Sequence, residues 1–157
     1  MQLQIDNEKR TEQKSETIKP SRKFYFDTSI WLDFLEDRNE PNLPKGKWAK
    51  ELVRKIVRDN DKIFLSDVNY KELNGLGYSR YDLGELMLSI RKSIIPIYST
   101  DKQIGKAQDL ALKRMIPKSD VLQAFLARDN QAILITLDHH FKKIIDITTP
   151  HRPDEFI

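Results

Sequence analysis

Short apolar runs alternate with segments of helical periodicity from residue 24 to the end of the chain. The runs are rich in Ile and Phe and are bounded by polar or turn residues, which is typical of buried strands. This pattern predicts strands at 24–26, 62–65, 94–98, 132–136 and 144–147. Strands that alternate with helices form a parallel sheet with crossover helices, so the pattern predicts an α/β fold.

The segments between the predicted strands have the spacing of helices. Trp48, Leu52 and Ile56 repeat every four residues and would share one helix face. The segment 81–91 is apolar on more than one side, which is typical of a helix that is buried or lies at an interface. Residues suited to helix N-caps precede three of the helices, at Ser79, Thr100 and Ser119.

The start of the chain differs from the rest in composition. Residues 1–23 contain six Lys or Arg, four Asp or Glu and no aromatic residue, so they offer little to bury. We therefore predict a flexible polar extension over residues 1–22 and one folded domain over residues 23–157. Because Lys19, Arg22 and Lys23 cluster before the first strand, the extension is either a solvated tail or an arm that binds nucleic acid or a partner.

Composition excludes several classes of protein. The 157 residues fit one domain, and the net charge of +3 permits contact with a polyanion without requiring it. The absence of Cys excludes disulfides, zinc fingers, iron–sulfur sites and thiol nucleophiles. The longest apolar run, 132–137, is too short to span a bilayer, and no signal-peptide pattern opens the chain. We therefore expect a soluble, cytoplasmic protein.

Four acidic residues stand out by their positions. Asp27 directly follows the first predicted strand and Asp138 follows the fourth, at the edge where open α/β sheets bind their ligands. Asp120 lies in the first turn of a predicted helix, and Glu72 lies in a short helix after the second strand. If the first and fourth strands are neighbours, all four carboxylates converge on one cleft.

Such a cluster of carboxylates predicts a cation. Carboxylates within about 6 Å of one another repel, which raises their pKa values unless a positive charge neutralises them. Mg²⁺ and Mn²⁺ prefer oxygen ligands and promote reactions at phosphate, because they polarise a phosphate oxygen and activate water. Hydrolysis of a phosphodiester is therefore the reaction that the four acids favour.

Each acid also has a structural explanation. Asp27 could cap the following helix, Asp120 could interact only with the dipole of its helix, and Glu72 could face solvent. Asp67 competes with Glu72, but it follows Ser66 in what looks like a cap and first turn, so we interpret it as structural.

Two other kinds of chemistry are less well supported. His139 and His140 could bind a metal or carry protons, but two adjacent histidines in a loop more often lie at the surface, which is the interpretation we favour. A phosphatase of the haloacid dehalogenase type would need a second Asp two positions after Asp27, where Ser29 stands. The sequence also contains no Gly-rich loop that would hold a phosphate.

Four motifs occur in one order along the chain: YFDTSIWLDFL, SDVNYKEL, SDVLQA and ITLDHHF, followed by a closing ITTPHRPDEFI. In this set the chain resembles the PIN-domain nuclease family, and particularly its small VapC-like toxin ribonucleases, over residues 23–157. The resemblance implies a three-layer α/β/α sandwich with a central parallel sheet of four to five strands, the last of them in the closing segment. The polar extension and the longer, Pro-rich segment 38–47 depart from a minimal toxin.

The resemblance also implies a set of functional residues. Asp27, Glu72, Asp120 and Asp138 correspond to the family's catalytic acids, and would bind Mg²⁺ or Mn²⁺ for in-line hydrolysis of an RNA phosphodiester. Asp27 and Asp120 would hold the principal ion, with Asp138 completing its ligands and Glu72 orienting water or a second ion. Hydroxyl groups that would fix these carboxylates come from Thr28, Ser29 and Thr136.

The expected partners follow from the same resemblance. Single-stranded or looped RNA would bind basic residues near the motifs, and the candidates are Lys71, Arg80, Arg114, Lys118, Lys142 and Lys143. A cognate antitoxin peptide would cover the cleft, and two copies of the chain would form a homodimer through early helices, including the apolar segment 81–91. The alternatives are a housekeeping PIN nuclease in RNA processing or turnover, or a PIN-like scaffold that binds RNA or protein without cleaving it.

Overall fold

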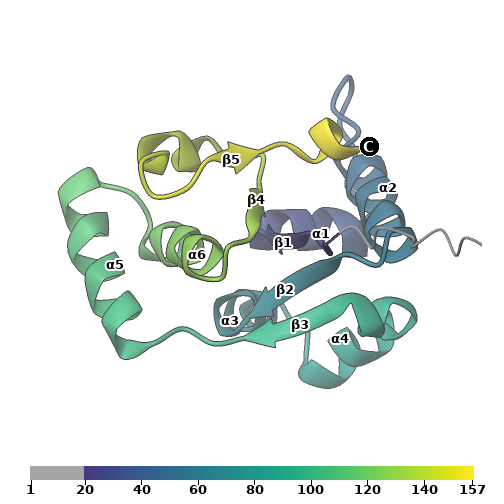
Figure 1. Ribbon diagram of the computed structural model, residues 1–157, viewed down its shortest axis with the longest axis horizontal. Coiled ribbons are helices and arrows are strands. Elements are labelled where there is room, and N and C mark those ends of the chain that lie inside the picture. Colours follow the sequence, from purple (N-terminus) through teal and green to yellow (C-terminus); the bar gives the residue numbers. More distant parts are fainter. Residues whose placement is uncertain (1–19) are drawn as a thin grey trace, which may run out of the picture.

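Five parallel strands form the central sheet in the computed structural model, which describes residues 20–157 (Figure 1). The strand order is β3-β2-β1-β4-β5, so the first strand lies in the middle of the sheet and pairs with both the second and the fourth. This order confirms the α/β fold and brings the ends of β1 and β4 together, as the acidic site requires. The strands are β1 (Lys23–Phe26), β2 (Lys62–Ser66), β3 (Ile94–Ile97), β4 (Ile133–Ile135) and β5 (Pro150–His151).

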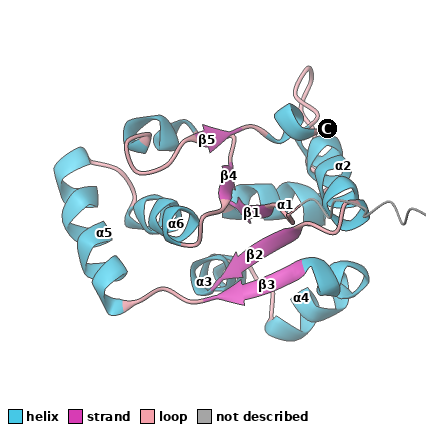
Figure 2. Cartoon of the chain, in the orientation of Figure 1, coloured by secondary structure: helices cyan, strands magenta, loops and turns pink. Residues whose placement is uncertain are grey.

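Helices cover both faces of the sheet (Figure 2). The α-helices are α1 (Thr28–Glu36), α2 (Lys45–Arg58), α3 (Asp67–Gly75), α4 (Arg80–Leu86), α5 (Asp101–Arg114) and α6 (Lys118–Asp129). Three short 3₁₀ helices are η1 (Leu88–Ser93), η2 (His139–Ile144) and η3 (Pro153–Phe156). No helix within residues 20–157 is long and apolar enough to cross a membrane.

The alternation of side chains along β1 divides the core into two layers. Phe24 and Phe26 are fully buried against α1 and α2 on one face of the sheet. Tyr25, between them, points to the other face, where it packs with α5 and α6. Figure 1 shows α5 and α6 on one side of the strands and α2 on the other. These three layers are the α/β/α sandwich that the family resemblance implied.

Most of the predicted elements exist, but two have other limits. Residues 144–147 do not form a strand, because Ile144 ends η2 and is buried in the core, and the fifth strand is Pro150–His151, within the closing segment of the family resemblance. The expected helix at 81–91 is broken: α4 ends at Leu86, and η1 follows. Leu83, in α4 before the break, and Ile90, in η1 after it, are both buried.

The predicted N-caps are confirmed in two of three positions. Ser79 and Thr100 each accept a hydrogen bond from the backbone three residues on, in a capping box. Ser119 does not cap α6, because this helix already begins at Lys118, after Pro117. Proline can precede a helix start because it needs no hydrogen bond to its own nitrogen.

Most of the predicted extension over residues 1–22, namely residues 1–19, lies outside the described residues. Arg22, at its end, donates hydrogen bonds from its backbone nitrogen and its Nε to the buried Asp61 carboxylate, at 2.7 and 3.1 Å. Its guanidinium also lies over the rings of Phe24 and Phe156. Arg22 therefore joins the start of β1 to the loop before β2 and to η3.

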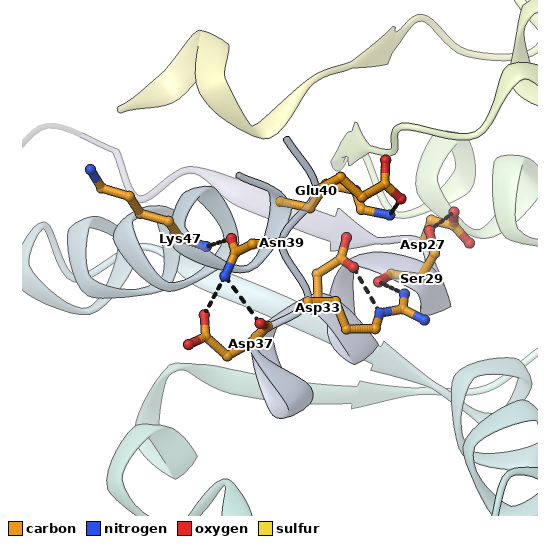
Figure 3. A network of polar contacts seen from close by, with 9 residues as sticks. Asp27, Ser29, Asp33, Asp37, Asn39, Glu40 and Lys47 are labelled. Carbon is orange, nitrogen blue, oxygen red and sulfur yellow. Dashed lines mark hydrogen bonds and ion pairs between the residues drawn. The ribbon is translucent and has the colours of Figure 1, made fainter. Parts of the chain in front are cut away.

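The Pro-rich segment 38–47 is held against the end of α1. Arg38 donates to the buried Asp33 carboxylate at 2.9 Å and to the carbonyl oxygen of Ser29 at 3.1 Å. Figure 3 shows Asn39 bridging Asp37 and the backbone of Lys47, with bonds of 3.1 Å to each. The segment is thus tied to the same helix that follows Asp27.

Gly46 allows this segment to pass close to α2. A Cβ atom on Gly46 would lie 2.6 Å from the backbone carbon of Asp37 and 2.7 Å from the nitrogen of Arg38. Backbone atoms at such distances cannot give way without moving the loop. Only glycine therefore fits the first turn of α2 at this position.

We expect Gly46→Ala to lower the free energy of unfolding by about 1–3 kcal/mol, the usual cost of overpacking. The matched control is Gly105→Ala in α5, where nothing lies near the added Cβ and alanine should gain up to about 1 kcal/mol of helix propensity. Urea denaturation of both variants measures the difference. Equal stability of the two variants would contradict the close approach at Gly46.

Candidate active site

Asp27 is buried at the carboxyl end of the central strand. Its backbone nitrogen continues the ladder by donating to the carbonyl oxygen of Ile135 at 3.0 Å. Although it occupies the N-cap position of α1, its side chain makes no capping bond. Instead Oδ2 accepts hydrogen bonds from Ser29 Oγ at 2.7 Å, drawn in Figure 3, and from Thr136 Oγ1 at 3.0 Å. Two hydroxyls therefore fix this carboxylate, and the capping interpretation does not describe its side chain.

Glu72 lies beside Asp27 and is held by a second set of donors. Its Oε1 atom accepts hydrogen bonds from Thr28 Oγ1 and from Gln123 Nε2, both at 3.1 Å. The Nε2 group of Gln123 also lies 3.5 Å from Asp27 Oδ1. Gln123 on α6 therefore bridges two of the predicted acids, and Glu72 does not simply face solvent.

A buried polar network beneath these acids was not predicted from the sequence. Asn69 and Gln123 are completely buried, and Asn69 Nδ2 donates to Thr28 Oγ1 at 2.9 Å and to Gln123 Oε1 at 3.1 Å. Tyr25 adds its hydroxyl, 2.7 Å from Ser66 Oγ and 3.3 Å from Gln123 Oε1. The signal that could have revealed Gln123 is its position in α6, where it is the one polar residue among the apolar side chains of residues 121–127.

Asp120 and Asp138 meet at a histidine. Asp120, in the first turn of α6, has its Oδ2 atom 3.0 Å from His140 Nδ1. Asp138 Oδ1 lies 3.4 Å from the same nitrogen and also accepts the backbone N–H of His140 at 2.9 Å. One ligand atom from each of the three residues falls within 4.8 Å of the others. Both histidines lie at the surface, as expected, but His140 also contacts Asp120 and Asp138, whereas His139 belongs to no such group within residues 20–157.

The charges of these acids act on one another. Burial, followed by the charges of Asp27 and Asp138, raises the pKa of Asp120 to about 6. Burial also raises the pKa of Asp27, to which the charge of Asp138 adds, while hydrogen bonds from Ser29 and Thr136 oppose the shift. For Glu72, burial and then the charge of Asp27 raise the pKa. The ionised cluster is therefore unfavourable by itself, and a cation would relieve it.

The donor set fits a hard divalent cation. Carboxylate oxygens from β1, α6 and the end of β4 are the ligands that Mg²⁺ and Mn²⁺ prefer. Asp120 and Asp138, with His140, form the group in which three ligand atoms are already close. Asp27 interacts with both acids electrostatically and is fixed by its hydroxyl donors.

A groove adjoins the acidic cluster between α3, α5 and α6. It has a volume of about 520 Å³ and runs past Glu72. Its apolar floor and basic rim come from Val68, Ile104, Leu122, Lys71 and Lys118. Two of the predicted RNA-binding residues, Lys71 and Lys118, therefore face the same groove.

The other basic candidates lie elsewhere. Arg80 stacks over the ring of Tyr70 at 4.9 Å, and Lys142 and Lys143 are exposed on η2. Arg114 is engaged by Asp146 through two bonds of 2.7 and 2.8 Å. Asp67, interpreted as structural, accepts the backbone N–H of Ser99 at 2.9 Å and the Ser99 hydroxyl at 2.6 Å, so it ties α3 to the end of β3.

Comparison with known proteins identifies the family. The family model of the PIN domain matches residues 24–146, and the chain belongs to this family. No curated protein matches the sequence.

Solved structures share the fold at low sequence identity. VapBC-1 from nontypeable Haemophilus influenzae has a TM-score of 0.58 at 21% identity, over 84% of this chain and 98% of that one. A toxin–antitoxin complex from Klebsiella pneumoniae has a TM-score of 0.56 at 16% identity, over 83% and 97% of the chains. VapBC2 from Rickettsia felis, bound to a DNA fragment from its promoter, has a TM-score of 0.55 at 18% identity, over 83% and 98%. The protein thus has the fold of a VapC-like PIN domain.

The raised pKa of Asp120 predicts a pH-dependent effect of Asp120→Asn in the metal-free protein. Above pH 6 the folded wild type must hold an ionised Asp120 beside Asp27 and Asp138, whereas the unfolded chain holds it at little cost. The variant should therefore melt a few degrees above wild type at pH 8 in EDTA. The difference should shrink by pH 5, where wild-type Asp120 binds a proton.

Calorimetry across this pH range measures the effect. Asp109→Asn, at an exposed position of α5, is the matched control and should melt with wild type at both pH values. A stabilisation of Asp120→Asn that grows toward pH 5 would have the wrong sign for a carboxyl group with a raised pKa.

Proposed function

We propose that the protein is a divalent-metal-dependent endoribonuclease and the toxin of a toxin–antitoxin pair. The observation that carries the proposal is the set of carboxylates at the carboxyl ends of β1 and β4 in a PIN domain, with the pKa values of Asp27, Glu72 and Asp120 raised. Burying several carboxylates together costs free energy unless a cation compensates their charge. Hydrolysis of a phosphodiester uses such an arrangement.

In the proposed reaction, Asp27, Asp120 and Asp138 would hold Mg²⁺ or Mn²⁺. The bound ion would supply a positive charge that polarises a phosphate oxygen and activates water. Asp27 is suited to be a metal ligand of fixed position, because hydrogen bonds from Ser29 and Thr136 hold its rotamer. Glu72 keeps its Oε2 atom outside the hydrogen bonds with Thr28 and Gln123, and we assign this atom to orienting the attacking water.

We propose RNA with an unpaired strand as the substrate. The groove beside Glu72 supports this assignment, because it combines a basic rim at Lys71 and Lys118 with an apolar floor. Lysine side chains bind phosphates of any sequence, and apolar surfaces accept the faces of unpaired bases. An A-form duplex does not offer its bases to such a groove.

We propose a cognate antitoxin and a second copy of the chain as protein partners. The similar folds of three toxin–antitoxin complexes support the antitoxin. Exposed apolar side chains on α4 and η1, namely Tyr81, Leu86 and Leu88, support a protein interface on that side of the domain. The housekeeping alternative differs in lacking the antitoxin, and relief of growth arrest by co-expression of an adjacent small gene would distinguish the two roles.

We expect Asp27→Asn and Asp120→Asn each to abolish cleavage of a mixed single-stranded RNA while the fold is retained. Each change removes a negative charge from the proposed metal ligands without changing the size of the side chain. Cleavage by purified protein should require Mg²⁺ or Mn²⁺ and stop in EDTA, with circular dichroism as the control for folding. Cleavage at the wild-type rate in both variants would refute the assignment.

Glu72→Gln and Asp67→Asn form a matched pair on α3. We expect Glu72→Gln to slow cleavage at least tenfold, equivalent to about 1.4 kcal/mol in the barrier. Asp67→Asn should retain activity but lose about 1 kcal/mol of stability. The reason is that asparagine has one acceptor oxygen, whereas the backbone N–H and the hydroxyl of Ser99 each donate to a separate oxygen of Asp67. The reverse ranking in activity would mean that Asp67, and not Glu72, serves the reaction.

The groove predicts an effect on RNA affinity that is separate from chemistry. In an Asp27→Asn background, Lys71→Ala with Lys118→Ala should weaken binding of single-stranded RNA and lower the logarithmic salt slope by about 0.7 for each phosphate that is no longer bound. The control replaces Lys102 and Lys113 of α5, which do not line the groove. Equal salt slopes for the two double variants, measured by fluorescence anisotropy, would exclude phosphate binding in the groove.

A further inference from the structure

His140 lies where a metal ligand would stand. Its Nδ1 atom is 3.0 Å from Asp120 Oδ2 and 3.4 Å from Asp138 Oδ1. An octahedral ion with bonds of about 2.0–2.1 Å has neighbouring ligand atoms about 3 Å apart. The two separations that involve His140 are therefore close to those of neighbouring positions around one ion, and the oxygens of Asp120 and Asp138 lie within 4.8 Å of each other.

The fold holds His140 in this position. Phe141, the next residue, is 1% exposed and packs in the core beneath α6. The backbone N–H of His140 is fixed by Asp138 Oδ1 at 2.9 Å. The turn is thus anchored on both sides of the histidine, which a freely solvated surface residue would not require.

The exposure of the three side chains leaves one side of the group open. Asp120 is 10% exposed, Asp138 37% and His140 50%. An ion held by them would have protein ligands below and solvent above, where water or a phosphate oxygen could enter. His139 is exposed and belongs to no such group, so the chain offers a neighbouring histidine as an internal control.

We propose that His140 is a metal ligand through Nδ1, together with Asp120 and Asp138, and that it makes the site prefer Mn²⁺ to Mg²⁺. This inference rests on the proposed metal-dependent function. Mn²⁺, a first-row transition metal, accepts an imidazole nitrogen more readily than Mg²⁺, which prefers oxygen donors and water. Carboxylate ligands suit both ions, so the nitrogen donor is the group that shifts the balance toward Mn²⁺.

The direct test is pulsed electron paramagnetic resonance of the full-length protein loaded with Mn²⁺. Wild type and His139→Ala should show modulation from a coupled ¹⁴N nucleus, and His140→Ala should lose it. Calorimetric titration should show that His140→Ala weakens Mn²⁺ binding at least tenfold, as expected when one ligand is removed. Mg²⁺ binding should change less than about threefold, because Mg²⁺ replaces the nitrogen with water.

A second variant separates ligation from packing. His140→Gln retains a polar side chain at the half-exposed position, and its melting temperature should stay near that of wild type. If it also lacks the nitrogen modulation, the imidazole itself is the ligand. If the nitrogen modulation survives in His140→Ala and disappears in His139→Ala, the ligand is His139, and the proposal is overturned.

The outcomes also distinguish this inference from the proposed function. If wild type binds Mn²⁺, Asp120→Asn does not, and no ¹⁴N modulation is seen, the acidic metal site stands and the role of His140 falls. If wild type binds neither Mn²⁺ nor Mg²⁺, both proposals fail together.

Discussion

The structure depends on how it accommodates negative charge at one edge of a buried sheet. Asp27 lies at the end of the central strand with 4% of its surface exposed, and Asp120 and Asp138 act on it electrostatically. Burial of a carboxylate is expensive unless donors or cations compensate it. Two hydroxyls and an amide surround Asp27, but no Lys or Arg forms an ion pair with it among residues 20–157. The compensation is thus incomplete in the protein alone, which is what a metal site requires.

The same donors join elements that are far apart in the sequence. Gln123 contacts groups from β1, α1 and α3, and Asn69 joins α3 to the first turn of α1. Burial holds the pKa of Tyr25 well above its usual value, so its phenol keeps the proton that it shares with Ser66 or Gln123. A buried polar network is stable only when every member has a partner. The geometry of the acids and the packing of α3 and α6 on the sheet are therefore determined together.

The sequence predicted the parts of this arrangement that depend on local patterns. Strand and helix periodicity indicated the α/β fold, and the positions of Asp27 and Asp138 after apolar runs indicated which sheet edge carries the acids. The fifth strand was misplaced because Ile144 and Ile147 pack in the core from a 3₁₀ helix and turn while Ile145 is exposed, whereas Pro150–His151 has almost no strand signal. The sequence did not predict Gln123 and could not choose between the surface and metal-binding interpretations of His140, because the contacts of these residues with Tyr25 and Asp120 span 98 and 20 positions. Single-chain patterns do not encode such contacts.

The site has a fixed half and a more exposed half. Asp27 and Glu72 accept hydrogen bonds from α1, from α6 and from Thr136 just after β4, so these carboxylates are held in place. Asp138 and His140 stand on a 3₁₀ turn, and half of the histidine side chain remains in solvent. The groove that runs past Glu72 and the solvent above Asp138 and His140 both give access to the acids. In the proposed metal site, the fixed half would supply ligands of defined geometry, and the exposed turn would determine which ion fits beside them. Changes on the turn should alter metal preference without disturbing the core, since only Phe141 and Ile144 anchor it there.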